Sequence, residues 1–120
     1  MPKLLVVDDE IDIVEVTKRF FKKRGLDVFT ASDGDEAIRV IKAENPDLIL
    51  LDYNLPILSG LEILKKLRNE LKLNTKVIMV TGFEAEMGIN ETKGLAIEGC
   101  IHKPLDLEKL EKVVMTAIQS

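Results

Sequence analysis

Short apolar segments alternate with amphipathic segments along the chain, and this alternation restricts the possible folds more than any other feature. Four runs rich in Leu, Val and Ile are typical of strands buried on both faces of a sheet. These runs are 3–7, 26–31, 47–52 and 76–81, and a weaker fifth strand is expected at 100–102. Buried strands of this kind predict a parallel sheet that is covered by helices.

Helical spacing of apolar residues marks the segments between the strands. The clearest helix spans 10–24 and ends at Gly25, and its buried stripe is expected to contain Ile11, Val14, Lys18 and Phe21. A second helix is expected at 35–43, a third after Ser59 as N-cap, a fourth within 84–98, and a fifth after Asp106 as N-cap. Strands that alternate with helices through short loops predict an α/β, doubly wound parallel sheet.

Length and charge exclude several classes of protein. The 120 residues fit one domain, so we expect 1–120 to form a single domain and not a two-domain enzyme. A formal net charge of −4 matches a polyanion poorly, which argues against direct nucleic-acid binding. No apolar run approaches the roughly 18 residues of a membrane span, and the single cysteine, Cys100, forms no internal disulfide. We therefore expect a soluble, cytoplasmic protein without membrane association.

Polar residues stand where the predicted strands end. Asp8 and Asp9 follow the first strand, Asp52 ends the third, Thr81 ends the fourth and Lys103 follows the fifth. In an open parallel sheet the ligand site lies outside the carboxyl ends of the strands. These residues are far apart in sequence, so only the predicted fold would bring them together.

The expected carboxylate cluster requires a positive charge. Three carboxylates within about 5 Å would repel each other by roughly 3 kcal/mol per pair at an effective dielectric of 20. Lys103 supplies one cation, and oxygen ligands of this type favour Mg²⁺ over zinc. A magnesium ion beside a hydroxyl and an ammonium group is suited to phosphoryl transfer.

Four segments with these residues resemble the receiver domains of two-component response regulators, including the chemotaxis regulators. They are Val-Val-Asp-Asp-Glu at 6–10, Leu-Leu-Asp-Tyr-Asn-Leu-Pro-Ile-Leu-Ser-Gly at 50–60, Val-Thr-Gly at 80–82 and Ile-His-Lys-Pro at 101–104. The resemblance covers the whole chain. It implies a flavodoxin-like fold with five helices around a five-stranded parallel sheet of order 2-1-3-4-5.

The resemblance also implies a reaction and its metal ligands. Asp52 would be the phosphoacceptor, taking a phosphoryl group from a sensor histidine kinase or phosphotransfer protein. Asp8, Asp9, Asp52 and the backbone carbonyl of Asn54 would hold Mg²⁺ as cofactor. The domain would not be an enzyme in the usual sense, although it would catalyse its own phosphorylation and slow dephosphorylation.

A switch is implied as well. Thr81 and Lys103 would contact the phosphoryl oxygens, and a cis peptide bond before Pro104 would turn the lysine toward the site. Phosphorylation would then change the surface of the fourth helix, fifth strand and fifth helix, where a downstream effector protein or a fused output domain would bind. The resemblance leaves the oligomeric state open between a monomer and a weak dimer.

Two departures and three alternatives accompany the resemblance. Cys100 stands where the family usually has Tyr or Phe, and Gly99 stands where it often has Asp. Cys100 gives some weight to a pseudo-receiver, an interaction module that works without phosphorylation. An aspartate-nucleophile phosphatase would need Asp-x-Asp after the first strand, where this chain continues with Glu10. A dinucleotide-binding enzyme would need glycines there, and the first glycine is Gly25.

Overall fold

The fold is a parallel sheet between two layers of helices. The computed structural model describes residues 1–82 and 94–119. The sheet has the order β2-β1-β3-β4-β5, and all of its strand pairs are parallel. Its strands are β1 (Lys3–Val7), β2 (Asp27–Ala31), β3 (Leu48–Asp52), β4 (Lys76–Thr81) and β5 (Gly99–His102). This order confirms the flavodoxin-like topology that the resemblance implies.

Four α-helices lie among the described residues. They are α1 (Ile11–Lys22), α2 (Gly34–Glu44), α3 (Gly60–Lys65) and α5 (Leu107–Gln119), and α3 continues into a π-helix at Lys66–Glu70. The fourth helix of the prediction, expected within 84–98, falls mostly outside the described residues. None of the described helices is both long and apolar enough to cross a membrane.

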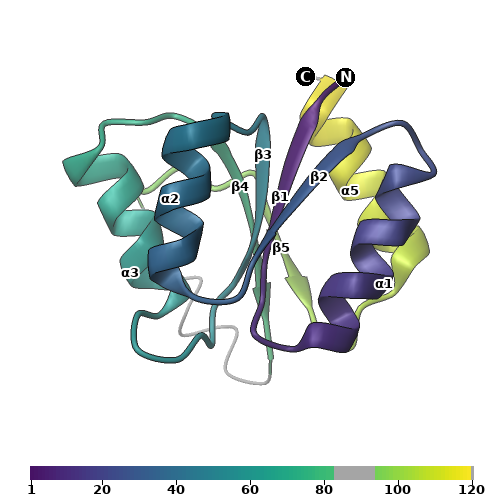
Figure 1. Ribbon diagram of the computed structural model, residues 1–120, viewed down its shortest axis with the longest axis horizontal. Coiled ribbons are helices and arrows are strands. Elements are labelled where there is room, and N and C mark those ends of the chain that lie inside the picture. The colour runs from purple at the N-terminus through teal and green to yellow at the C-terminus, as the bar shows by residue number, and fades with distance from the viewer. Residues whose placement is uncertain (83–93, 120) are drawn as a thin grey trace.

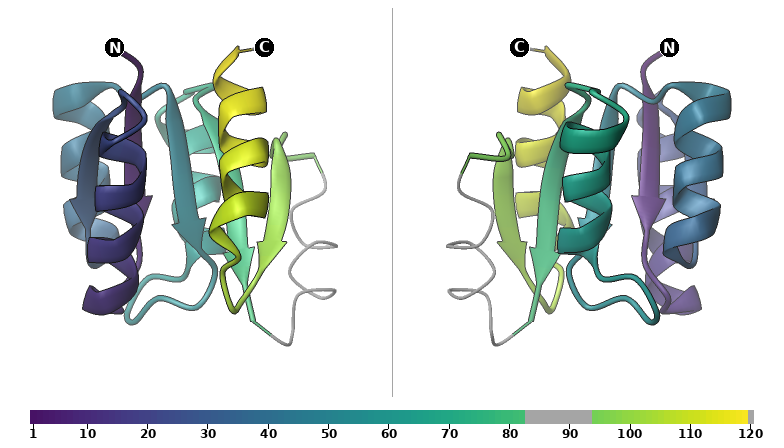
Figure 2. Two further views of the ribbon diagram at one scale, coloured as in Figure 1. Left: turned by 90° about the vertical axis from the view of Figure 1, so that its right-hand side faces the viewer. Right: turned by 90° about the vertical axis from the view of Figure 1, so that its left-hand side faces the viewer.

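The two layers of helices cover opposite faces of the sheet. α1 and α5 pack on one face and α2 and α3 on the other (Figures 1 and 2). Alternate residues of β1 serve the two layers, because successive side chains of a strand point to opposite faces. Leu4 and Val6 join the core beneath α1 and α5, whereas Leu5 and Val7 join the core beneath α2 and α3. β3 is buried along its full length, as its continuous apolar run predicts.

The buried face of α1 differs from the predicted stripe. Ile11 is 75 % exposed, and Thr17 lies in the core beside Phe21 in place of the neighbouring Lys18. A threonine side chain is short and carries no charge, so it is easier to bury than a lysine side chain. The shift leaves an apolar residue in solvent at the start of α1.

Two predicted N-caps are confirmed by their hydrogen bonds. The Ser59 hydroxyl accepts from the backbone N–H of Glu62 at 3.2 Å at the start of α3. The Asp106 carboxylate accepts from the N–H groups of Glu108 and Lys109 at 3.0 and 3.4 Å before α5. Each cap satisfies an N–H group that has no partner within its helix.

Arg68, on the π-helix, binds four backbone carbonyls that lie in two separate segments. Its guanidinium donates to the carbonyl oxygens of Leu73 at 2.7 Å and Thr75 at 2.8 Å, just before β4. It also donates to Leu95 at 2.8 Å and Ala96 at 3.2 Å, just before β5. The planar fork of an arginine suits this arrangement, whereas a lysine has only three donors on one nitrogen.

We therefore expect Arg68→Lys to lower the free energy of unfolding by about 2 kcal/mol, because carbonyls in a half-buried site lose their donors. Urea unfolding measures the change. Arg39→Lys, at an exposed arginine on α2, is the matched control and should change stability by less than about 0.5 kcal/mol. Equal effects of the two substitutions would show that the guanidinium bonds contribute no stability.

Candidate functional site

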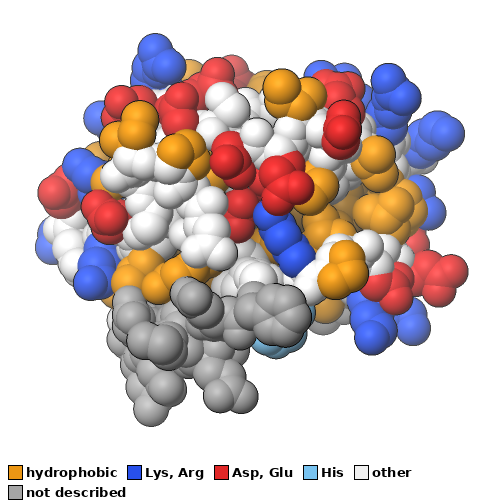
Figure 3. Space-filling view, turned by 90° about the horizontal axis from the view of Figure 1, so that it is seen from below, with side chains coloured by type: hydrophobic (Ala, Val, Ile, Leu, Met, Phe, Trp, Pro, Cys, Tyr) orange, Lys and Arg blue, Asp and Glu red, His pale blue; other side chains and the backbone are white. Residues whose placement is uncertain are grey.

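The polar residues at the strand ends meet at one edge of the sheet. Asp8 follows β1, Asp52 is the last residue of β3, Thr81 is the last of β4 and Lys103 follows β5. Asp8, Asp52 and Thr81 are each less than 5 % exposed. Seen from this edge, acidic side chains lie beside a basic one near the middle of the face (Figure 3). The predicted convergence of these residues is thus confirmed, and their chemical roles remain predictions.

Backbone hydrogen bonds fix the loops that carry the site. The N–H of Lys103 donates to the carbonyl of Thr81 at 2.7 Å, which extends the pairing of β4 and β5 to the lysine. The N–H of Tyr53 donates to Val80 at 2.8 Å and extends the pairing of β3 and β4 in the same way. The Lys103–Pro104 peptide bond is cis, as the resemblance implies.

Gly60 brings the start of α3 against the backbone of Asp52. Its N–H donates to the carbonyl of Tyr53 at 3.0 Å. A Cβ at position 60 would overlap the carbonyl oxygen of Asp52 and lie 2.9 Å from the Cα of Tyr53. Only glycine fits this contact without moving α3 away from β3.

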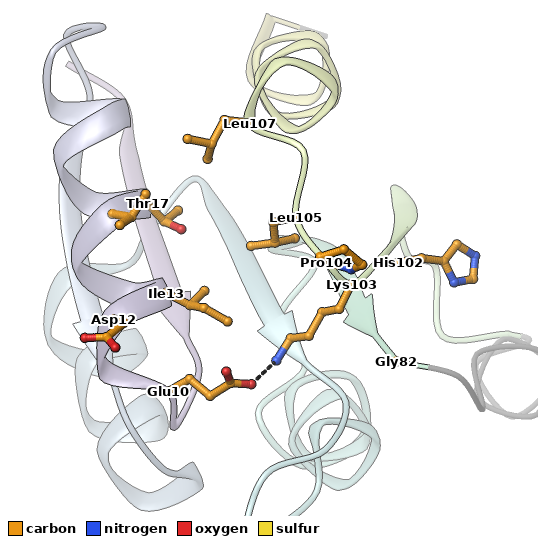
Figure 4. A pocket seen from close by; sticks show the side chains of 11 residues that line it. Glu10, Asp12, Ile13, Thr17, Gly82, His102, Lys103, Pro104, Leu105 and Leu107 are labelled. Carbon is orange, nitrogen blue, oxygen red and sulfur yellow. Dashed lines mark hydrogen bonds and ion pairs between the residues drawn. The ribbon is translucent and has the colours of Figure 1, made fainter.

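Lys103 binds three carboxylates with one ammonium group. Its Nζ lies 3.0 Å from Oε1 of Glu10, 3.2 Å from Oδ2 of Asp52 and 3.3 Å from Oδ2 of Asp8. Figure 4 shows the lysine side chain extending from the end of β5 toward Glu10 at the start of α1. The ammonium thus offsets part of the repulsion between the carboxylates.

The site shifts the pKa values of both Asp52 and Lys103. Burial and the nearby charge of Asp8 raise the pKa of Asp52 to about 6, against the opposing effects of the Asn54 N–H and of Lys103. Burial by itself would lower the pKa of Lys103. The hydrogen bond to Glu10, followed by the charges of Asp52 and Asp8, raises the pKa of this lysine above its ordinary value. The site therefore disfavours the charged form of Asp52 and favours the charged form of Lys103.

The carboxylates of Asp8, Asp9 and Asp52 fit a hard divalent cation. One oxygen of each lies within 4.8 Å of the others, and Asp9 is the exposed member of the group. Carboxylate oxygens are the ligands that Mg²⁺ prefers, and an exposed edge leaves room for the water molecules that Mg²⁺ usually retains. The donor set thus agrees with the expected metal site.

The neighbourhood of Thr81 contains the main departure from the family pattern. The Thr81 hydroxyl lies 3.8 Å from the sulfur of Cys100 on the adjacent strand β5, at the distance of a weak hydrogen bond. Cys100 is half-buried, and the next polar residue of β5, His102, is exposed. A small thiol thus occupies the place beside Thr81 where the family usually has an aromatic ring.

A groove of about 810 Å³ runs beside Lys103. It lies between α1 and the segment that leads from β5 into α5 (Figure 4). Its lining is mainly apolar and includes Ile13, Val16, Pro104, Leu105 and Leu107. Val16 is 53 % exposed and Ile11, at the start of α1, is 75 % exposed. An apolar surface thus adjoins the acidic site.

Glu10 is the site residue that the sequence prediction did not assign. Its contact with Lys103 joins positions 93 residues apart, so no local spacing indicates it. The available signal was the position of Glu10, directly after the Asp8-Asp9 pair at the end of a predicted strand.

Comparisons with known proteins agree with the fold. The family model described as the response regulator receiver domain matches residues 4–115. Sporulation initiation phosphotransferase F of Bacillus subtilis is 34 % identical over 112 residues, which cover 93 % of this chain and 90 % of that protein. The alkaline phosphatase synthesis transcriptional regulatory protein PhoP of the same organism is 46 % identical over 84 residues. That match covers 70 % of this chain but only 35 % of PhoP.

Solved structures show the same similarity in three dimensions. A CheY-like response regulator receiver domain protein from Methanospirillum hungatei superposes with a TM-score of 0.92 at 28 % identity, covering 99 % of this chain and 94 % of that one. Chemotaxis protein CheY4 of Vibrio cholerae gives a TM-score of 0.89 at 30 % identity, covering 98 % of both chains.

Proposed function

This chain belongs to the response regulator receiver domain family, and we propose that it accepts a phosphoryl group on Asp52 in a Mg²⁺-dependent reaction. The donor is a phosphohistidine of a sensor histidine kinase or of a phosphotransfer protein. Receiver domains are signalling domains and not classical enzymes. This one would catalyse its own phosphorylation and slow dephosphorylation, without transferring the group to a small molecule.

The reaction exchanges one bond at phosphorus. A carboxylate oxygen of Asp52 bonds to phosphorus while the bond to the donor's imidazole nitrogen breaks, and the bonding electrons leave with that nitrogen. Asp8, Asp9, Asp52 and the backbone carbonyl of Asn54 would hold Mg²⁺, which when bound neutralises charge on the phosphoryl oxygens. Lys103 stabilises the same charge from the other side of the site, and the Thr81 hydroxyl donates to a phosphoryl oxygen.

One observation carries this proposal: a carboxylate that is only 2 % exposed lies 3.2 Å from a lysine ammonium and next to two further carboxylates. A purely structural site would pair one acid with one base. An excess of acid around a buried aspartate instead favours binding of a divalent cation, and an open edge admits a phosphoryl group.

The donor must bring its phosphorus to Asp52, so its surface must rest on the rim of the site. The apolar groove between α1 and the segment before α5 adjoins this rim, and Ile11 and Val16 expose apolar surface on α1. We assign this face to the donor. Apolar contacts would supply the affinity, while Lys103 and the metal would orient the phosphoryl group.

The conformational change that follows phosphorylation would begin at Thr81. Movement of its hydroxyl toward the phosphoryl group would break its contact with Cys100 and alter β5. β5 leads into α5, so the surface of β5, α5 and the predicted helix within 84–98 would change. A downstream effector protein or a fused output domain would bind this surface.

Phosphorylation by acetyl phosphate tests the proposal without a protein donor. With Mg²⁺, we expect intact-protein mass spectrometry to show the addition of one phosphoryl group, located on Asp52 after borohydride trapping of the acyl phosphate. Chelation of Mg²⁺ and Asp52→Asn should each abolish the product. Absence of the product in wild type, or its persistence in Asp52→Asn, would favour a pseudo-receiver that works without phosphorylation.

A further inference from the structure

Glu10 occupies the N-cap position of α1 but does not cap the helix. Its backbone is extended there, and its side chain accepts no hydrogen bond from the first turn. Glutamate is a poor N-cap compared with the shorter Asp, Asn or Ser. The carboxylate instead reaches across the site and accepts a hydrogen bond from Lys103 at 3.0 Å. The Glu10 side chain therefore binds Lys103 and does not cap its own helix.

The ammonium of Lys103 donates to Glu10 and Asp52 and forms an ion pair with Asp8, so a new ligand must compete with these carboxylates for the lysine. It carries three N–H groups, and three carboxylates lie within 3.3 Å of its nitrogen. The side chains of Asp8 and Asp52 are 5 % and 2 % exposed, whereas that of Glu10 is 57 % exposed. Glu10 can thus return to water at the lowest cost when the lysine changes partners.

Given the proposed function, we propose that Glu10 is a positioning residue that holds Lys103 in the unphosphorylated protein and competes with the phosphoryl group for this lysine. A phosphoryl group adds nearly two negative charges and several strong acceptor oxygens. Lys103 then turns one N–H toward the group and releases Glu10 to solvent. The strength of the Glu10 contact therefore sets part of the balance between the free and phosphorylated states.

Two substitutions separate the effect of the length of the Glu10 side chain from the effect of its charge. Glu10→Asp retains the negative charge, but its side chain is one methylene shorter and no longer reaches Lys103. It also places a good N-cap before α1, so the helix is preserved. Glu10→Gln keeps the length and replaces a charged acceptor by a weaker neutral one. Glu15→Gln is the matched control, because Glu15 is an exposed carboxylate of the same helix that does not line the groove.

Beryllofluoride, which mimics a phosphoryl group on aspartate, is the probe. The chain has one tyrosine and no tryptophan, and Tyr53 is adjacent to Asp52, so tyrosine fluorescence reports on the site. At Mg²⁺ concentrations that saturate each variant, we expect Glu10→Asp and Glu10→Gln to be half-saturated at about threefold lower beryllofluoride than wild type, as befits a partly exposed ion pair. Glu15→Gln should match wild type.

The outcomes separate this role from its alternatives. If Glu10→Asp behaved as wild type while Glu10→Gln bound more tightly, charge alone would account for the effect and the positioning role would be wrong. Unchanged or weaker binding in both variants, as a merely structural role would give, would also overturn it. A wild-type protein that failed to bind beryllofluoride with Mg²⁺ would instead overturn the proposed function itself, and with it the role of Glu10.

Discussion

In the absence of divalent cations, the free energy of unfolding of the wild-type protein should fall relative to that of Asp52→Asn as the pH rises from about 4 to about 6. Folding raises the pKa of Asp52 from 3.8 to about 6, chiefly through burial. The folded protein therefore holds this proton more tightly than the unfolded chain does. The resulting stabilisation is fully present below the lower value and is lost as the pH passes the higher one.

The magnitude follows from the size of the shift. A change of about two pKa units corresponds to roughly 2–3 kcal/mol. At pH 7 with chelator present, the free energy of unfolding of Asp52→Asn should therefore exceed that of wild type by about 2 kcal/mol. Urea unfolding of both proteins across this pH range measures the difference. Glu15→Gln, at an exposed carboxylate on α1, is the control and should run parallel to wild type. Parallel curves for wild type and Asp52→Asn would show that the charge of Asp52 costs no stability.

The same electrostatics explain why an unfavourable arrangement is compatible with function. Asp8 and Asp52 are buried together, and the single ammonium of Lys103 cannot neutralise both of them and Glu10. Binding of a divalent cation would relieve this repulsion, so the energy that destabilises the free protein favours the ligand. Binding sites commonly lower the stability of a protein in this way.

The strands and their ends could be predicted because their signals are local. The bounds of β1 and β4 agree with the predicted runs, and the remaining strand boundaries differ by one residue at their starts. Once strands of a parallel sheet are located, the position of Asp52 or Thr81 at their carboxyl ends follows from geometry. The order of the strands did not follow from periodicity, and only the resemblance to receiver domains indicated it.

Features that depend on distant partners could not be predicted. Arg68 reads as an ordinary basic residue of an amphipathic helix, because the carbonyls of Leu95 and Ala96 that it binds are 27 and 28 residues away. The exposure of Ile11 depends on how α1 is rotated against α5, and a count of apolar spacing is consistent with more than one rotation. The hydrogen bond from Lys103 to Glu10 could not be predicted either, because it joins positions 93 residues apart.

Gly60→Ala should lower the free energy of unfolding by about 3 kcal/mol, near the upper end of the usual cost of overpacking. The new methyl group would overlap the carbonyl oxygen of Asp52 and lie 2.9 Å from both the carbonyl carbon of Asp52 and the Cα of Tyr53. These are backbone atoms and cannot rotate away, so α3 must move off the end of β3. Asp52 would shift with its backbone, and phosphorylation by acetyl phosphate should slow by about tenfold or more.

Gly99→Ala provides the matched control for this substitution. Gly99 begins β5, and a Cβ there would meet nothing closer than the Val113 side chain at 3.8 Å, an ordinary van der Waals contact. Its effect on stability should stay within about 0.5 kcal/mol. Urea unfolding and the rate of acyl phosphate formation measure both variants. A Gly60→Ala protein as stable and as reactive as Gly99→Ala would mean that α3 is free to move without disturbing Asp52, and that the close contact at Gly60 does not hold the phosphoacceptor in place.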